Sequence, residues 1–385
     1  MFRSSVVTFG IFAAFVACTS ARADISISKQ PTRNMSCSGG VCTATAKNAV
    51  LNVDDLTNML TAGDATVKFG GGALAIQINE GFSWTSDNRL TLDANTSLGF
   101  HKPVTVAGEG GLTLTYNDGG SGSDLKFFGN GKINFWGTNS GLIIDGVVYT
   151  LETDIRTLAK DIAAEPSAAY GLANDYDATS DGPYSNSPVS TALGGTVNGL
   201  GHTIAHLSIQ SNEEPCTGLF ATVLQSGTLR NISLRDVSVM GNGRVGILAG
   251  CSDGSVTAAS AEGSVSAGAG TDQSSGDVGG LIGYADVDSV VASAQASVDV
   301  VAGDYNNVGG LIGRSWGTVV KSHASGNIVA GDKALAGGLV GDSSNNSGQA
   351  ISDCYATGAV TSKQISGGLV GEASIIAGSY ATGAV

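Results

Sequence analysis

Three aspartates in one stretch of the chain could bind a calcium ion. Asp175, Asp177 and Asp181 lie within residues 174–188, where Asp, Asn, Ser and Pro are frequent, and this composition predicts a long loop. Carboxylate oxygens are hard ligands, which Ca²⁺ prefers. The spacing lacks the glycine and the distal glutamate of an EF-hand loop, so acids that are solvated in a turn are the alternative interpretation.

Two histidines, His202 and His206, have the four-residue spacing of a zinc site on a helix. The surrounding residues 197–209 indicate strand and turn instead, and the glutamate of the His-Glu-x-x-His pattern is missing. The sequence therefore argues against a zinc peptidase and predicts no metal site beyond the calcium candidates.

Catalysis of glycan cleavage would need carboxylates that converge on one face of the fold. An inverting glycosidase holds two of them roughly 6.5–9.5 Å apart. The available acids, Asp286, Asp288 and Asp299, occupy non-equivalent positions of the repeat described below. The sequence shows no Ser-His-Asp, phosphate-loop or dinucleotide-binding pattern, so we predict no catalytic and no cofactor-binding residues.

The cysteines favour one short disulfide. Cys37 and Cys42 enclose a four-residue loop that could close in an oxidising compartment. Cys216, Cys251 and Cys354 fall at different phases of the repeat, so pairing between neighbouring coils is not indicated. We interpret these three as buried small residues, with at most one further pair among them.

The last third of the chain contains a repeat that indicates which secondary-structure elements position these groups. A motif of the form x-Gly-x-Leu-x-Gly starts at residues 245, 278, 308, 336 and 366, so its copies are 28 to 33 residues apart, and the last four have Gly-Gly-Leu at its centre. A second motif follows at 260–265, 293–298, 323–328, 355–360 and 380–385. Self-similarity at this period indicates a solenoid. His323 begins its copy of the second motif where Tyr355 and Tyr380 begin theirs, which favours a packing role.

The motif residues are predicted to form the scaffold of short strands. Paired glycines would each cost about 1 kcal/mol in a helix, and the neighbouring residues are β-branched. Residues such as Gly279, Leu281 and Gly283 alternate, so we expect them to share one strand face and to stack on their equivalents about 4.8 Å away. The predicted scaffold residues are Gly246, Leu248, Gly250, Gly279, Leu281, Gly283, Gly309, Leu311, Gly313, Gly337, Leu339, Gly341, Gly367, Leu369 and Gly371.

The repeat resembles the GLUG motif, and residues 355–360 and 380–385 look like its usual second half. Residues 199–209 and 218–220 look like the segment that precedes such arrays. Together they are similar to bacterial surface proteins of the filamentous-haemagglutinin-like class. That resemblance implies a right-handed parallel β-helix, an all-β solenoid with short helical insertions, and an adhesin-like role.

The N-terminus has the features of a cleaved signal peptide over residues 1–23. Arg3 precedes an apolar stretch at 6–17, and Ala21-Arg-Ala23 forms a cleavage site. Lipidation at Cys18 is the alternative. Twelve apolar residues are too few to span a bilayer, so we expect a secreted or cell-surface protein without a transmembrane helix.

Composition excludes several classes of protein. Loss of residues 1–23 would remove Arg3 and Arg22 and change the net charge from −14 to −16, so phosphate backbones would be repelled and nucleic-acid binding is not expected. Charged residues make up 14% of the chain, against roughly 25% in ordinary domains. Few charges and many glycines suit an elongated β-solenoid.

Four segments follow from these patterns. Residues 1–23 are the signal peptide, and 24–150 form an N-terminal cap, irregular over 24–50, with a short helix at 53–60 and the first coils. Residues 151–198 form a junction with a helix at 153–164 and a loop, and 199–385 form the repeats. The sequence leaves open whether the two halves form one stack.

The predicted function is that of an exported, non-enzymatic, adhesin-like protein. Its expected partner is a host or neighbouring-cell surface protein or glycan, with no cofactor. A polysaccharide lyase or hydrolase and a passive structural stalk are the alternatives. Because the chain ends in mid-repeat, without a polar cap, we also expect either a longer protein or stacking on another chain.

Overall fold

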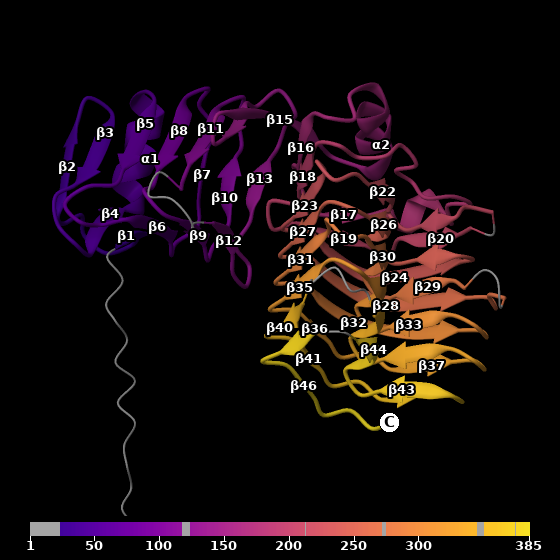
Figure 1. Cartoon of the computed structure of the whole chain (residues 1–385). Helices are drawn as coiled ribbons and strands as arrows, with labels where there is room; N and C mark the ends of the chain where they lie inside the picture. The colour runs from indigo at the N-terminus through magenta and orange to yellow at the C-terminus, as the bar shows by residue number, and fades with distance from the viewer. Residues whose placement is uncertain (1–23, 118–123, 212, 272–274, 345–349, 374) are drawn as a thin grey trace, which may run out of the picture.

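The computed structural model describes residues 24–117, 124–211, 213–271, 275–344, 350–373 and 375–385. The predicted signal peptide lies outside these residues. The chain forms a parallel β-solenoid of about 12 turns with two α-helices, which confirms the predicted fold class. Figure 1 shows two stacks of coils that meet at an elbow. We call residues 24–144 the first stack and residues 169–385 the second stack.

The first stack has three sheets. An antiparallel hairpin, closed by the expected disulfide between Cys37 and Cys42, forms the outer end of the longest sheet. Residues 24–50 contain strands at 24–28, 35–38, 41–44 and from 49 onward, with short turns between them, so this region is more regular than the irregular cap that was predicted. The strands are β1 (Asp24–Ser28), β4 (Ala49–Asn52), β6 (Ala75–Ile78), β9 (Leu98–Phe100) and β12 (Leu125–Phe127) in one sheet; β7 (Phe82–Trp84), β10 (Val104–Val106) and β13 (Ile133–Phe135) in another; and β2 (Met35–Ser38), β3 (Val41–Ala44), β5 (Ala65–Lys68), β8 (Arg89–Asp93), β11 (Gly111–Thr115) and β14 (Leu142–Ile144) in the longest.

A helix lies at the start of each stack. Helix α1 (Val53–Ala62) begins at Asn52, whose side-chain oxygen accepts hydrogen bonds from two backbone amides of the first turn at 2.8 and 3.4 Å. Helix α2 (Ile155–Ala164) packs against the second stack and is held by Tyr170, whose hydroxyl donates to the carbonyl oxygens of Asp161 and Glu165 at 2.8 Å. Both helices were expected at these places. Their buried residues are Val53, Leu56 and Leu60 in α1 and Ile155, Leu158 and Ile162 in α2.

A two-residue turn reverses the strand direction between the stacks. Asp145 and Gly146 have φ angles of 47° and 80°, the left-handed conformations of a tight hairpin turn. They join β14 to β15 (Val147–Glu152) as an antiparallel pair, and β15 then pairs in parallel with β16 (Ala169–Leu172). The longest sheet therefore continues through both stacks, but its strands run in opposite directions on the two sides of this turn.

The hydrophobic core changes to the other face of this shared sheet at the same point. Leu151 belongs to the core of the first stack, whereas Tyr170 and Leu172 belong to the core of the second. Leu151 pairs with Gly171, so Tyr170 and Leu172 point to the opposite face. The strand direction is therefore reversed, and the face of the sheet that carries the core is reversed with it. Because the two reversals compensate, both stacks coil with the same handedness.

Four sheets form the second stack, and the repeats add strands to each of them. The shared sheet continues with β18 (Thr196–Asn198), β23 (Thr228–Arg230), β27 (Ser255–Thr257), β31 (Val290–Ala292), β35 (Thr318–Val320), β40 (Ile351–Ser352) and β45 (Ile376–Ala377). An 11-stranded sheet contains β17 (Tyr176–Asp177), β19 (Thr203–Ala205), β20 (Ser208–Gln210), β24 (Ser233–Gly241), β28 (Ser260–Ala267), β32 (Gln295–Ala302), β36 (His323–Ala324), β37 (Ile328–Ala330), β41 (Tyr355–Ala356), β42 (Val360–Thr361) and β46 (Tyr380–Ala381). Two 6-stranded sheets contain β21 (Cys216–Thr217), β25 (Arg244–Val245), β29 (Asp277–Gly279), β33 (Asn307–Gly309), β38 (Leu335–Gly337) and β43 (Ile365–Gly367), and β22 (Phe220–Val223), β26 (Ala249–Ser252), β30 (Ile282–Ala285), β34 (Ile312–Ser315), β39 (Val340–Ser343) and β44 (Val370–Ala373).

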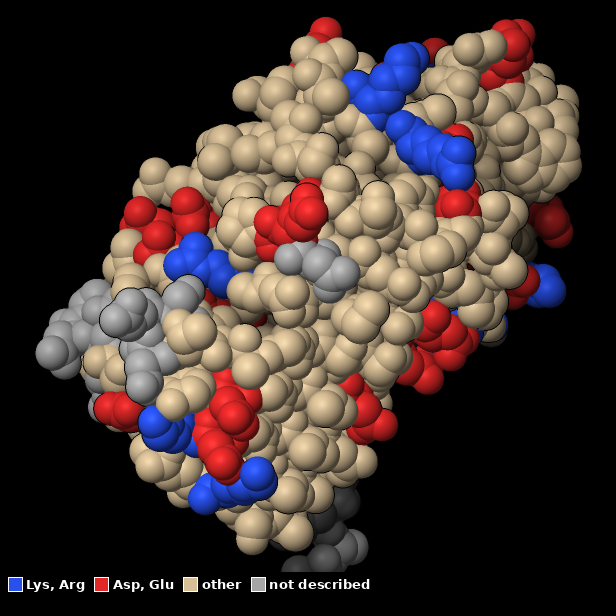
Figure 2. All heavy atoms as spheres, turned by 90° about the vertical axis from the view of Figure 1, so that its right-hand side faces the viewer, with Lys and Arg blue, Asp and Glu red and all other residues tan. Residues whose placement is uncertain are grey.

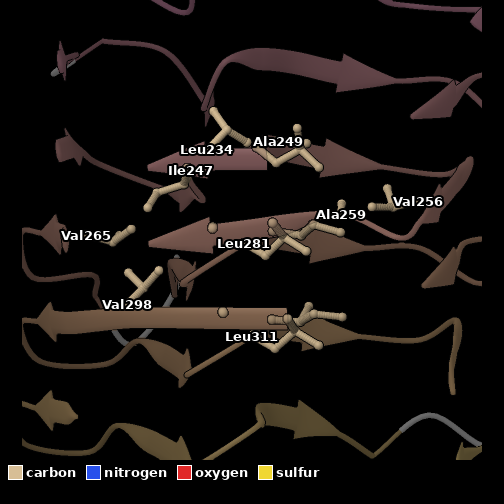
Figure 3. Packing of buried hydrophobic residues seen from close by; sticks show 14 of the residues in the cluster. Leu234, Ile247, Ala249, Val256, Ala259, Val265, Leu281, Val298 and Leu311 are labelled. Carbon is tan, nitrogen blue, oxygen red and sulfur yellow. The ribbon is translucent and has the colours of Figure 1, made fainter. Parts of the chain in front are cut away.

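The Gly-Gly-Leu motif forms a corner between the two 6-stranded sheets. Strand β29 ends at Gly279 and β30 begins at Ile282, so the prediction that Gly279, Leu281 and Gly283 share one strand face was wrong. The amide of Leu281 donates to the carbonyl oxygen of Leu311 in the next coil at 2.9 Å. Both leucine side chains are fully buried and lie one above the other in the coil interior (Figure 3).

Glycine is needed at this corner because the backbone turns back close to itself there and also touches the backbone of the next coil. A Cβ atom on Gly309 would lie 1.9 Å from the carbonyl oxygen of Ile312 and 2.9 Å from the amide nitrogen of Gly341. Gly279 is equally crowded, 2.0 Å from the carbonyl oxygen of Ile282. Real Cβ atoms are essentially never found so close to backbone atoms. These glycines are therefore packing positions.

The second motif is linked to the first by a contact across the interior. A Cβ atom on Gly310 would lie 2.9 Å from the Cβ of Ala324, and one on Gly338 would lie 2.9 Å from the Cβ of Ala356. The alanine of the second motif thus faces the second glycine of the corner, and neither position has room for a larger side chain. This contact explains why the two motifs recur together.

Candidate functional site

One arginine of the second stack is held by two residues of the first. Nη2 of Arg230 lies 2.6 Å from Oδ1 of Asp124, and Nη1 donates to the hydroxyl of Tyr116 at 3.2 Å. The side chains of Arg230 and Asp124 are 21% and 31% exposed. Burial raises the pKa of Tyr116 to about 12, so its hydroxyl keeps its proton near neutral pH. These contacts help to fix the angle of the elbow.

A buried histidine makes a second connection between the stacks. Nε2 of His202 lies 2.7 Å from the carbonyl oxygen of Ile133, and Nδ1 lies 3.0 Å from Oδ1 of Asp175. Nζ of Lys132, in the first stack, lies 2.6 Å from Oδ2 of the same carboxylate. The hydrogen bond from His202, with a further one from Lys132, holds the pKa of Asp175 well below its usual range. His202 and Asp175 therefore join the two stacks.

The other two acids of the calcium hypothesis have separate partners. Asp177 lies 2.9 Å from Nδ1 of His206, and Asp181 accepts hydrogen bonds from the hydroxyls of Tyr176 and Tyr184 at 2.9 and 2.6 Å. Within the described part of the chain, no group of three or more His, Cys, Asp or Glu side chains is arranged to hold a metal ion. The structure thus does not gather Asp175, Asp177 and Asp181 around one point.

Glu152 is a carboxyl group buried at the junction. The residue is 2% exposed, and its Oε1 has no hydrogen-bond partner among the described residues. Burial raises the pKa of Glu152 to about 7. The folded protein therefore favours the protonated carboxyl more than the unfolded chain does. As the pH rises from about 4.5 through 7, the free energy of unfolding should decrease.

Replacing Glu152 with glutamine should remove this pH dependence. We expect Glu152→Gln to be about 3 kcal/mol more stable than the parent at pH 8, since the pKa of Glu152 rises from 4.5 to about 7 and one pKa unit corresponds to about 1.4 kcal/mol, and to differ little at pH 4. Urea unfolding at pH 4, 6 and 8 measures the difference. The exposed Glu165 gives the matched control, Glu165→Gln. An equal effect of Glu152→Gln at all three pH values would contradict the prediction.

The inner side of the elbow, between the first stack and the 11-stranded sheet, is hollowed into a groove. A cavity of about 430 Å³ lies between the end of β12 and the 11-stranded sheet, and a second cavity of about 430 Å³ continues along that sheet. Ser233, Ser260 and Gln295 line both cavities, which makes them one continuous depression. We call it the elbow groove.

Side chains at equivalent positions of successive coils form the floor of this groove. Ser233 and Ser260 place their hydroxyl oxygens 2.6 Å apart. Farther along the sheet, the rings of His323 and Tyr355 stack with centroids 4.6 Å apart, and those of Tyr355 and Tyr380 with centroids 5.4 Å apart. Burial lowers the pKa of His323, which favours its neutral form. The series at this register position is Thr203, Ser233, Ser260, Gln295, His323, Tyr355 and Tyr380, of which the last two lie beyond the residues that line the groove.

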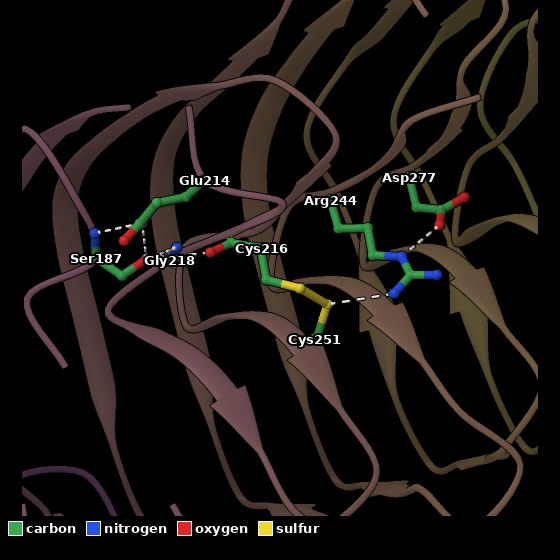
Figure 4. The surroundings of a disulfide bond; sticks show 7 residues. All are labelled: Ser187, Glu214, Cys216, Gly218, Arg244, Cys251 and Asp277. Carbon is green, nitrogen blue, oxygen red and sulfur yellow. Dashed lines mark hydrogen bonds and ion pairs between the residues drawn. A yellow bond between two sulfur atoms is a disulfide. The ribbon is translucent and has the colours of Figure 1, made fainter. Parts of the chain in front are cut away.

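A disulfide between neighbouring coils was not predicted from the sequence. Cys216 lies before the corner of one coil and Cys251 after the corner of the next, with their Cα atoms 5.6 Å apart. Figure 4 shows the bond beside Arg244, whose Nη1 is 3.7 Å from the sulfur of Cys251 and whose Nε is 3.4 Å from Asp277. Cys354 is buried and free, as expected.

Sequence reasoning found part of the elbow groove without recognising it. Ser260, His323, Tyr355 and Tyr380 were identified as equivalent positions. The copy between Ser260 and His323 was wrongly placed at Ser293, because the structure pairs Gln295 with both Ser260 and His323. No sequence pattern indicated that residues 124–131 form the wall of the groove, because their position beside the 11-stranded sheet depends on the reversal of strand direction at Asp145.

Comparison with known proteins identifies a distant relative. The chain is 29% identical over 243 residues to Halomucin of Haloquadratum walsbyi. The match covers 63% of this chain and 2% of Halomucin, so it spans a very small part of that protein. No family model matches the chain. In the described residues, no helix has both the length and the apolar character needed to cross a membrane.

Proposed function

We propose that this chain is an exported, non-enzymatic β-solenoid that presents an extended surface and binds a cell-surface or matrix partner. The observation that carries the proposal is the elbow groove, an open polar depression on a scaffold whose motif residues are used for stacking. A solenoid offers a long surface of this kind without a mobile active site.

Other features support export and a surface location. Two disulfides are typical of proteins that fold in oxidising compartments. Figure 2 shows a face of the second stack on which uncharged side chains predominate and charged ones occur in small groups. The similarity to Halomucin agrees with a surface structural role. The signal peptide at residues 1–23, the GLUG-type repeat and the haemagglutinin-like adhesin class remain parts of this proposal.

The alternative of a carbohydrate-active enzyme has less support from the geometry. The carboxylates that line the elbow groove are Asp124, which is paired with Arg230, and Glu262. In the repeats, Asp288 accepts from the amide of Gln225 and Asp299 from that of Asn327. A glycosidase would need two carboxylates free to act on one bond.

A binding assay and a turnover assay distinguish the proposals. Labelled protein comprising residues 24–385 is expected to bind intact cells or extracellular matrix saturably, and to release neither reducing ends nor unsaturated sugars from the bound material. Turnover of a glycan would favour the enzyme. Neither binding nor turnover would favour the passive stalk.

A further inference from the structure

We propose that the elbow groove binds a linear, uncharged glycan strand that lies along the coils of the 11-stranded sheet. This inference rests on the proposed function and names the chemical class of its partner. The lining of the groove, its charge balance and the position of one exposed ring carry it.

The lining of the groove suits a ligand rich in hydroxyl groups. Ser233, Ser260 and Gln295 present hydroxyl and amide groups on the floor, and Ser293 adds an exposed hydroxyl at its side. Hydroxyl and amide groups both donate and accept hydrogen bonds, as sugar hydroxyls do. The floor groups recur once per coil, about 4.8 Å apart. A polymer of similar units can therefore meet equivalent groups along the groove.

An aromatic ring lies at the edge of the groove. Phe128 is 40% exposed, and its ring stacks on His101 with centroids 4.6 Å apart and planes 9° apart. An exposed ring held in place by a second ring offers a flat apolar surface. The carbon–hydrogen face of a pyranose ring can pack on such a surface, and pockets that combine an aromatic side chain with a few polar groups are typical of small-ligand sites.

The charges of the lining favour an uncharged ligand. Two acids, Asp124 and Glu262, are balanced by two bases, Lys126 and Arg235. The whole chain has a net charge of −14, so an approaching polyanion would be repelled over long distances and would find no excess of positive charge in the groove.

An extended peptide fits the groove less well than a glycan. Peptides that add to a sheet pair with the free backbone groups of an edge strand. The floor of the elbow groove is the face of a sheet, and β24, β28 and β32 are each already paired on both sides. Side chains, and not backbone groups, are therefore what the groove offers to a ligand.

The test uses a substitution that the fold already tolerates elsewhere. Tyrosine stands at the register position of Ser260 in two later coils, at Tyr355 and Tyr380. Ser260→Tyr should therefore fold and fill the groove, and Gln295→Tyr provides a second blocking variant. Phe128→Ala removes the aromatic surface. Trp136→Ala is the matched control, because Trp136 is 72% exposed and lies outside the lining of the groove.

Calorimetric titration of residues 24–385 with cellohexaose, chitohexaose and a polygalacturonate hexamer measures binding. We expect at least one neutral hexamer to bind, with affinity reduced at least tenfold by either tyrosine variant and severalfold by Phe128→Ala, and unchanged by Trp136→Ala. Circular dichroism and urea midpoints check that each variant is folded.

Three results would overturn the inference: binding of polygalacturonate alone, neutral binding that survives both tyrosine variants, or no neutral binding while the protein still binds cells. The last result would leave the proposed function intact. Groove-dependent binding of a neutral hexamer without any binding to cells or matrix would support the inference and count against the proposed function.

Discussion

Replacing Gly309 with alanine should destabilise the second stack by about 3 kcal/mol or more, because the added methyl group collides with backbone and not with a movable side chain. The Cβ atom would lie 1.9 Å from the carbonyl oxygen of Ile312 and 2.9 Å from the amide of the coil above. Relief requires the corner between residues 309 and 312 to open and the two coils to separate. That separation would lengthen the hydrogen bonds that pass from Leu311 to Leu339 at 2.9 Å.

The effect should be localised, since each coil of a solenoid contacts only its neighbours. Peptide-resolved hydrogen exchange should show the largest loss of protection in the coils next to residue 309, and urea unfolding gives the change in free energy. Gly137→Ala is the control, because a Cβ atom there meets nothing within 4 Å. Equal stability of the two variants would show that the corner can expand without cost.

Removal of the disulfide between Cys216 and Cys251 should lower the free energy of unfolding by about 3–4 kcal/mol. The bond joins residues 35 apart and links the first corner of the second stack to the next coil. Its loss frees a long loop in the unfolded chain, and a longer closed loop gives a larger stabilisation in the chain-entropy account. The double variant Cys216→Ala/Cys251→Ala avoids an unpaired thiol.

Cys37→Ala/Cys42→Ala gives the comparison, because that disulfide joins residues only 5 apart. We expect it to cost about 2 kcal/mol by the same relation. Urea unfolding of the two double variants measures the difference. Thiol titration of denatured, unreduced protein comprising residues 24–385 should find one free thiol, that of Cys354; a larger number would show that one of the disulfides does not form.

The strands were predictable where the chain is straight. Short segments with apolar residues at both ends, at 90–92, 104–106, 112–114, 133–135 and 142–144, correspond within a residue or two to β8, β10, β11, β13 and β14. Alternating apolar residues between Gly, Asn and Asp define such segments locally. Local alternation was sufficient there because each segment keeps one face toward the core.

The corner misled the same reasoning. Treating Gly279–Gly283 as one strand gave the wrong face relations, and it also hid the partner of Cys216. At a corner, the residue that precedes the turn in one coil comes close to the residue that follows the turn in the next coil. The position of each cysteine within its repeat does not show this proximity, which is why Cys216 and Cys251 appeared unrelated in the sequence.

The elbow groove needed information that a single sequence does not contain. The Asp145-Gly146 pair is a hairpin signal, but that signal does not show that the core moves to the opposite face of the sheet. The contact between Arg230 and Asp124 joins residues 106 positions apart. The position of the groove wall depends on both.

Because the second stack grows away from the elbow, its length and the geometry of the bend could change independently in evolution. Inserting one coil into the second stack would move everything beyond it outward by about 4.8 Å and would leave Arg230, His202 and the residues that hold them untouched. The length of the second stack is then set by the number of repeats, and the geometry of the bend by a few residues that join the two stacks. The second stack can therefore be lengthened without changing the contacts that join the two stacks.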